Sequence, residues 1–230
     1  MGSAPEPIRT VALLPAYNLE SSIAAIVQRT LPFADRVLVV ADGSRDATAL
    51  RAREAGALVP EPEAVRGKGF ALRKGIRAAL ALKPERIVIL DSDGQHLPEE
   101  IPQMLQPLVE GRADLVSGSR FKGTLRTRFI NKLGNHFLRM LSFALTWRWL
   151  SDTETGYRAF RAEKLAELRL ESNGYEIESE IMMAALIKGF RIVEVPIHVP
   201  MAVPGVTVWD GFKVAWFKIR YALRLRVSSP

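Results

Sequence analysis

Two aspartates separated by one residue, Asp91 and Asp93, follow four apolar residues that favour β structure, 87–90. This run predicts a buried parallel strand, and open α/β sheets bind ligands where such strands end. In extended backbone, alternate side chains point the same way, so both carboxylates could bind one cation. Mg²⁺ and Mn²⁺ prefer oxygen ligands and often complete their coordination with substrate phosphates. The alternative is a solvated acidic cap at the strand end.

Two other stretches could contact a phosphorylated ligand. Arg66-Gly67-Lys68-Gly69 opens a predicted helix over 70–82, where backbone N–H groups and two cations could lie near a phosphate. Its spacing matches neither a Walker A loop nor a dinucleotide-binding fingerprint, so a flexible helix start with exposed cations is the alternative. Asp42, after the predicted strand 37–40, could bind a ribose or base, or only cap a turn.

Four further polar residues are less specific. Glu176, Glu178 and Glu180 alternate along the chain beside Tyr175, and this spacing favours a solvated acidic face. His96 stands beside the acidic pair, where it could support that site without binding the metal itself.

The elements that would position these residues alternate between strand and helix. This alternation predicts an α/β fold with a doubly wound, mostly parallel sheet. The predicted strands cover 11–14, 37–40, 57–59, 87–90, 114–118 (followed by Ser119 and Arg120), 155–160 and 191–195. The predicted helices cover 23–29, 47–55, 70–82, a segment beginning at 97–100, and 179–188.

Composition limits the class of protein. With 230 residues, 48% hydrophobic and 25% charged, the chain suits one α/β domain with a full core. The absence of cysteine excludes disulfides and thiolate metal sites. A net charge of +7 indicates an anionic partner, and no nucleic-acid-binding module is recognisable. Without a secretory signal or an apolar run near the roughly 20 residues of a membrane span, we expect a cytoplasmic protein.

Two amphipathic stretches favour contact with an anionic membrane surface, because basic residues and tryptophans flank their apolar stripes. Burial in the core or in a homodimer is the alternative. The stripes consist of Phe129, Leu133, Phe137, Met140, Ala144 and Trp147, and of Trp209, Phe212, Trp216, Ile219 and Leu223. We therefore divide the chain into a catalytic domain, 1–200, and an amphipathic extension, 201–230, that associates with a membrane or oligomerises.

An ordered set of short motifs resembles one enzyme family. The set consists of Leu14-Pro-Ala-Tyr-Asn18, Val39-Val-Ala-Asp-Gly-Ser-Arg-Asp-Ala-Thr48, Arg66-Gly-Lys-Gly-Phe-Ala-Leu72, Leu90-Asp-Ser-Asp-Gly-Gln-His96, Ser117-Gly-Ser-Arg120, Thr155-Gly-Tyr-Arg-Ala-Phe160 and Glu194-Val-Pro-Ile197. Together they resemble the family-2 inverting glycosyltransferases of GT-A fold. The branch that is most similar transfers mannose or glucose from a nucleotide-diphospho-sugar to a dolichyl or polyprenyl phosphate, peripherally, on the inner face of the membrane.

The resemblance implies a role for each site residue. Asp91, Asp93 and Arg120 would be catalytic, and Arg120 would bind the acceptor phosphate with Arg126 or Arg128. Mg²⁺ or Mn²⁺ would be held by Asp91, Asp93 and Gln95. The donor site would contain Pro15, Tyr17, Glu20, Asp42, Arg66, Lys68, Asp91 and Ser92. The chain departs from the family pattern at Ala41, at Leu19 and over 201–207, where an Arg-x-x-Gly-x-Ser-Lys stretch is common.

The acceptor decides whether a base is needed. A phosphate acceptor is ionised near pH 7 and needs positioning, whereas a hydroxyl acceptor needs a general base, for which Asp152, Glu154 and Glu178 are candidates. The leading prediction is transfer to a polyprenyl phosphate. The alternatives are a hydroxyl acceptor, nucleotidyl transfer with pyrophosphate release, and a non-catalytic nucleotide-binding module at a membrane.

Overall fold

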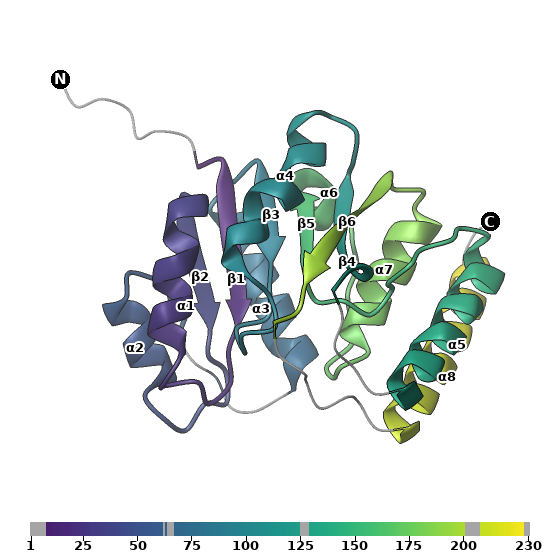
Figure 1. Ribbon diagram of the computed structural model, residues 1–230, viewed down its shortest axis with the longest axis horizontal. Helices are drawn as coiled ribbons and strands as arrows, with labels where there is room; N and C mark the ends of the chain where they lie inside the picture. The colour runs from purple at the N-terminus through teal and green to yellow at the C-terminus, as the bar shows by residue number, and fades with distance from the viewer. Residues whose placement is uncertain (1–7, 62, 64–66, 125–128, 201–207, 228–230) are drawn as a thin grey trace.

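The computed structural model describes residues 8–61, 63, 67–124, 129–200 and 208–227. Six strands form one sheet in the order β2-β1-β3-β5-β4-β6 (Figure 1). All neighbours pair in parallel except β5, which is antiparallel to β3 and to β4. The strands are β1 (Thr10–Pro15), β2 (Arg36–Val40), β3 (Arg86–Ile89), β4 (Leu115–Thr124), β5 (Arg158–Arg161) and β6 (Ile192–His198).

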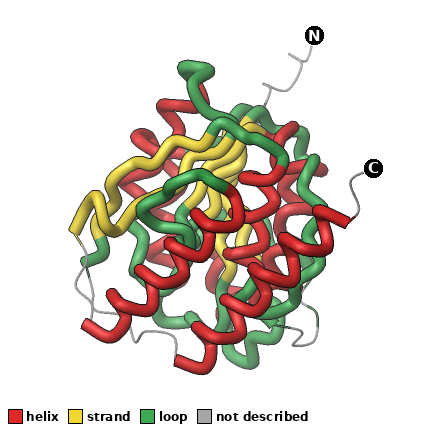
Figure 2. Tube along the Cα trace, turned by 90° about the vertical axis from the view of Figure 1, so that its right-hand side faces the viewer, coloured by secondary structure: helices red, strands yellow, loops and turns green. Residues whose placement is uncertain are grey.

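Helices cover both faces of the sheet. They are α1 (Ile23–Thr30), α2 (Thr48–Glu54), α3 (Lys68–Ala81), α4 (Ile101–Val109), α5 (Phe129–Thr146), α6 (Ala162–Ala166), α7 (Ile177–Ile187) and α8 (Val208–Val227), with short 3₁₀ turns at Leu31–Phe33 and Pro98–Glu100. The two long helices α5 and α8 lie side by side at one end of the molecule (Figures 1 and 2).

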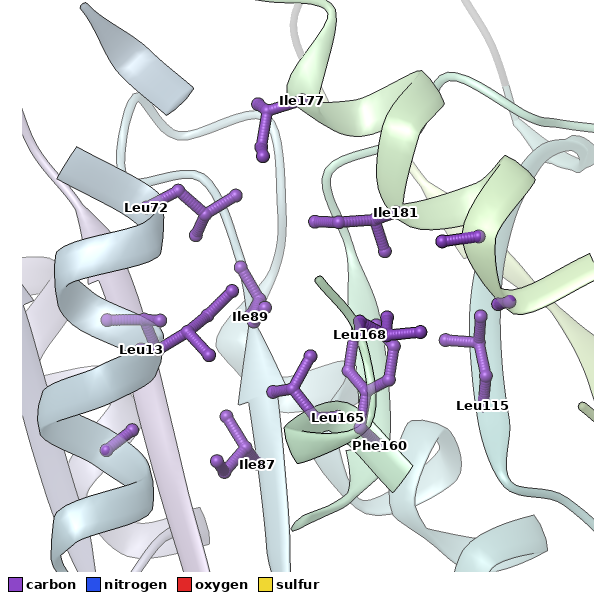
Figure 3. Packing of buried hydrophobic residues seen from close by; sticks show 14 of the residues in the cluster. Leu13, Leu72, Ile87, Ile89, Leu115, Phe160, Leu165, Leu168, Ile177 and Ile181 are labelled. Carbon is purple, nitrogen blue, oxygen red and sulfur yellow. The ribbon is translucent and has the colours of Figure 1, made fainter. Parts of the chain in front are cut away.

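The core has two layers because successive strand residues point to opposite faces. Leu13 and Ile87 pack against α3, α6 and α7, together with Phe160 and Ile181 (Figure 3). Their neighbours on the strands, such as Ala12 and Val88, pack on the other face against α1 and α4. Strands buried on both faces read as continuous apolar runs, which is why the sequence locates them well.

The predicted α/β architecture with a mostly parallel sheet is confirmed, with two local differences. The predicted strand at 57–59 is only a single parallel bridge between Leu38 and Leu58 at the sheet edge. The predicted strand at 155–160 begins at Arg158 and runs antiparallel between β3 and β4. Residues 151–156 thereby become a connecting segment beside Asp91, which follows β3, and beside Ser119 and Arg120 of β4.

Candidate active site

The loops after β1 and β2 are tied to each other by reciprocal hydrogen bonds. The backbone N–H of Asn18 donates to Ser44 Oγ (3.1 Å), and the side-chain oxygen of Asn18 accepts from the N–H of Arg45 (2.9 Å). The Glu20 carboxylate accepts from the N–H of Ala47 at 3.0 Å. Because β1 and β2 are parallel neighbours, these loops lie together at the carboxyl edge of the sheet.

The predicted nucleoside-pocket residues lie in or beside these loops. The Tyr17 side chain is 56% exposed and available for contact with a ligand. Asp42 is buried, and its Oδ1 accepts from Lys74 Nζ (2.9 Å) and from the N–H of Glu63 (3.0 Å). Its buried Oδ2 has no hydrogen-bond partner among the described residues. Asp42 is therefore anchored by helix α3 rather than only capping a turn.

Ser92 and Pro15 connect the ends of β3 and β1. The buried Ser92 hydroxyl donates to the backbone oxygen of Pro15. The predicted donor contact of Ser92 therefore cannot use this hydroxyl proton without breaking a contact within the protein. Both residues fix where the turn after β3 begins.

The backbone that carries Asp91 and Asp93 is not the extended strand that the sequence predicts. Strand β3 ends at Ile89, and residues 92–95 form a turn, so the alternation of an extended strand does not describe this pair. Asp93 is exposed and accepts from both the backbone N–H of Gln95 (3.1 Å) and its side-chain amide.

Asp91 is held by a lysine and by His96, the histidine expected to support the acidic pair without binding the metal. Its Oδ1 lies 3.0 Å from Lys68 Nζ, and its backbone N–H donates to His96 Nδ1 at 3.0 Å. His96 is buried and stacks on Tyr157. Burial lowers the pKa of His96, so the ring is neutral and Nδ1 can accept. Although burial would raise the pKa of Asp91, Lys68 holds it well below its usual range.

The donor atoms of this turn fit a hard divalent cation. Asp91, Asp93 and Gln95 offer two carboxylates and one amide oxygen, and Asp93 faces solvent. Among the residues that the structure describes, no group of three or more His, Cys, Asp or Glu side chains is arranged to hold a metal. A site with few protein ligands is typical of Mg²⁺, which keeps waters and binds substrate phosphates.

The glycines around Lys68 serve close packing rather than a phosphate cradle. A Cβ at Gly67 or Gly69 would lie 2.4 Å from a backbone oxygen of the segment 172–174. The N–H of Gly69 donates to the Asn173 oxygen at 2.8 Å, so this helix start is already bonded to the protein. Lys68 itself is half-buried and pairs with Asp91 and Glu178, which corrects the alternative of exposed cations at a flexible helix start. Its contact with the donor stays a prediction. Arg66 lies outside the described residues.

The predicted solvated acidic face at Glu176, Glu178 and Glu180 is wrong for two of its three members, because both are buried. Glu178 bridges Lys68 (3.0 Å) and Arg158 (3.0 Å). Glu180 accepts the backbone N–H groups of residues 171 and 172, both at 2.9 Å. Although burial would lower the pKa of Lys68, Asp91 and Glu178 raise it, so the ammonium stays charged.

Arg120, the predicted acceptor-binding residue, lies within β4 and not in a loop after it. Its Nε and Nη2 donate to the two oxygens of Asp152 at 2.7 and 2.9 Å, which fixes the plane of the guanidinium. Its side chain keeps 20% exposure, whereas that of Asp152 keeps 2%. The second predicted arginines, Arg126 and Arg128, lie outside the described residues.

All three carboxylates that could serve as a general base are bound to cations. Asp152 pairs with Arg120, and Glu178 with Lys68 and Arg158. Glu154 pairs with Lys218 of α8, and although burial would raise its pKa, this lysine lowers it. A carboxylate that is engaged by a cation is less available to accept a proton, so the described residues favour an acceptor that arrives ionised.

Helices α5 and α8 present apolar side chains to solvent. On α5 and just after it, Phe137, Met140 and Trp147 are 56%, 44% and 79% exposed. On α8 the described part of the predicted stripe is exposed as well, with Trp216 at 64% and Leu223 at 57%. In the described part of the chain, no helix combines the length and hydropathy needed to cross a bilayer.

Comparison with known proteins gives a family match and several relatives. The model of the family described as Glycosyl transferase family 2 matches residues 12–169. Polyprenol monophosphomannose synthase from Mycolicibacterium smegmatis is 33% identical over 92% of this chain and 88% of that protein. Undecaprenyl-phosphate mannosyltransferase from Micrococcus luteus is 32% identical over 95% of this chain and 100% of that protein.

A solved structure shows the same architecture. Glucosyl-3-phosphoglycerate synthase from Mycobacterium tuberculosis, in complex with Mn²⁺, uridine diphosphate and phosphoglyceric acid, superposes with a TM-score of 0.71. The match covers 97% of this chain and 80% of that one, at 23% identity. At this identity the likeness establishes the fold.

Proposed function

This chain belongs to glycosyl transferase family 2 and is a glycosyltransferase of GT-A fold, and from that premise we propose that it transfers a hexose from a nucleotide-diphospho-sugar to a polyprenyl phosphate at a membrane surface. The observation that carries the choice of acceptor is the ion pairing of Asp152, Glu154 and Glu178. A phosphate acceptor needs no base. The names of two relatives, a polyprenol monophosphomannose synthase and an undecaprenyl-phosphate mannosyltransferase, support the same choice.

In the proposed reaction, an oxygen of the acceptor phosphate attacks the anomeric carbon and the bond to the donor diphosphate breaks. The products are a polyprenyl-phosphate sugar and a nucleoside diphosphate. Arg120, oriented by Asp152, holds the acceptor phosphate, and the loops with Tyr17, Glu20 and Asp42 hold the nucleoside. Asp91, Asp93 and Gln95 would hold Mg²⁺ or Mn²⁺, which when bound stabilises negative charge on the diphosphate.

The exposed stripes of α5 and α8 support membrane contact. Trp216 and Leu223 face solvent on a helix that also carries Lys213 and Arg220, a combination typical of helices at anionic lipid surfaces. We expect the protein to sediment with phosphatidylglycerol vesicles and Leu223→Ser to weaken this. Leu50→Ser, at an exposed leucine of α2, is the matched control. Equal binding by both variants and the wild type would contradict the assigned surface. A cytoplasmic location and a homodimer stay predictions.

The test of the proposed function is product analysis with a panel of donors. GDP-, UDP- and dTDP-sugars are each incubated with Mn²⁺, with and without a short polyprenyl phosphate. Nucleoside diphosphate release that requires the lipid phosphate, with sugar moving to the organic phase, is the expected result. Pyrophosphate release, or release that ignores the lipid, would overturn the proposal.

A further inference from the structure

Helix α8 buries a lysine on the face opposite its exposed apolar stripe. Lys218 is 0% exposed, and the residues that share its face, Ala215 and Ala222, are 7% and 4% exposed. Burying a charge is costly unless the charge is paired and hydrogen-bonded. A helix that served only as an amphipathic surface would gain nothing from a buried ammonium at this position.

The ammonium of Lys218 joins α8 to two other parts of the chain, helix α5 and the segment 151–156. It donates to Ser142 Oγ on α5 (2.8 Å) and to Thr153 Oγ1 (3.3 Å), and it pairs with the Glu154 carboxylate. Glu154 also accepts from Ser179 Oγ on α7 at 2.6 Å. Lys218 therefore holds the segment 151–156 from the side of α8.

The segment 151–156 also touches the residues assigned to the reaction. Asp152 orients Arg120, and a Cβ at Gly156 would lie 2.5 Å from Asp91 Oδ2. Burial would lower the pKa of the Arg120 guanidinium, but nearby carboxylates raise it. Asp152 contributes most to this rise, and Glu154 is close enough to contribute as well. With Lys218 absent, the unpaired Glu154 carboxylate would compete with Asp152 for Arg120.

We propose that Lys218 is a positioning residue: by neutralising Glu154, it keeps Arg120 paired with Asp152 and holds the segment 151–156 against the site. The kinetic consequence of this proposal rests on the proposed function, because that function assigns Arg120 to binding the acceptor phosphate. It also makes the seating of α8, whose other face is the membrane-facing stripe, a condition for acceptor use.

The test compares Lys218→Met with the double variant Lys218→Met/Glu154→Gln, which removes both charges. Lys188→Met, at an exposed lysine after α7, is the matched control. We expect Lys218→Met to raise the KM for polyprenyl phosphate about 10-fold or more, while the Kd for nucleoside diphosphate changes less than about 2-fold. The double variant should recover most of the loss. The rise in acceptor KM at unchanged donor Kd is the result that a merely structural role of Lys218 would not produce.

Hydrogen exchange provides a readout that does not depend on the acceptor. Backbone amides of 151–156 should exchange faster in Lys218→Met and recover in the double variant, with 36–40 unchanged. An unchanged KM and exchange in Lys218→Met, or no recovery in the double variant, would overturn the proposal. If Lys218→Met does not fold, a double variant with near-wild-type exchange over 151–156 supports the proposal and faster exchange overturns it. If wild type ignores the lipid phosphate, the proposed function fails, while exchange still decides the role of Lys218.

Discussion

The part of the site that we propose binds the donor (the donor end) and the part that we propose binds the acceptor (the acceptor end) hold their charged groups in different ways. At the donor end, Tyr17, Glu20 and Asp93 are exposed, and backbone N–H groups of short loops position the two carboxylates. Asp42, which is buried and pairs with Lys74 of α3, is an exception at this end. At the acceptor end, buried charges pair with charges from distant elements. These pairs are Arg120 with Asp152, Arg158 with Glu178, and Lys218 with Glu154.

This difference indicates how each end meets its ligand. An exposed carboxylate costs little in the free protein and can be satisfied by a metal ion and a nucleotide when they bind. A buried pair gains little net stability because desolvation offsets its attraction, but it fixes geometry before the substrate arrives. The acceptor end is therefore preorganised, and the donor end is completed by its ligands.

The largest effect on activity is expected at the donor end. Asp93→Ala should lower the transfer rate by about 10³-fold or more, since a bound cation supplies several kcal/mol of charge stabilisation. Its melting temperature should stay that of the wild type because Asp93 is exposed. Removing the divalent cation from the wild-type reaction with EDTA should have the same effect on the rate. Glu99→Gln, the control at an exposed carboxylate, should leave the rate unchanged. Full turnover by Asp93→Ala would refute the cation site.

The largest effect on stability is expected at the acceptor end. Arg158 is 1% exposed, and Arg158→Met leaves Glu178 short of one partner in a buried site. Breaking such a pair costs about 3–5 kcal/mol, which corresponds to a fall of roughly 6–20 °C in melting temperature. Arg53→Met breaks an exposed pair with Glu61 and should cost about 1 kcal/mol or less. Equal losses in calorimetry would contradict the larger cost assigned to the buried pair of the acceptor end.

Arg120→Lys should change acceptor use without changing the donor site. A lysine keeps the charge but cannot reproduce the two parallel hydrogen bonds to Asp152. Because hydrogen bonds to charged groups contribute about 1.5–3 kcal/mol, we expect the acceptor KM to rise about 10- to 100-fold. Titration with nucleoside diphosphate should show an unchanged Kd, and Arg112→Lys is the control. A weakened Kd with normal acceptor KM would place Arg120 at the donor.

The smallest effect concerns an ion pair outside both ends. Arg191 holds the pKa of Asp114 at about 2, below its ordinary 3.8. The stability from this pair is present above about pH 4 and is lost as the pH falls through 2. Urea midpoints of the wild type should therefore fall more steeply below pH 4 than those of Asp114→Asn. Parallel pH dependences would show that the pair contributes nothing measurable.

The sequence was most informative where local pattern decides structure. Apolar runs located β1, β2 and β3, and the acidic turn after β3 marked Asp91 and Asp93. The acceptor end was harder, because its charges have meaning only through partners far along the chain. The sequence predicted a solvated Glu178, whereas the structure pairs it with Lys68 and Arg158. Nothing in the sequence distinguished Lys218 from the other cations of its helix, whereas the structure pairs it with Glu154.

The antiparallel direction of strand β5 escaped prediction for a related reason. Its apolar residues indicate a strand, but direction and neighbours depend on how the chain returns after α5. The sequence placed His96 beside the acidic pair as a possible supporting residue, but it could not show the contact, because the hydrogen bond from the N–H of Asp91 depends on the turn between them. In both cases a tertiary contact, and not residue type, sets the role.

The most direct test of the central claim compares two acceptors that differ in one group. Polyprenyl phosphate and the corresponding polyprenol have the same chain, but one presents an ionised phosphate and the other a hydroxyl. With a radiolabelled donor sugar, we predict transfer to the phosphate and none to the alcohol, because Asp152, Glu154 and Glu178 are engaged by cations. Comparable transfer to the polyprenol would show that the site provides a base, and would contradict the account.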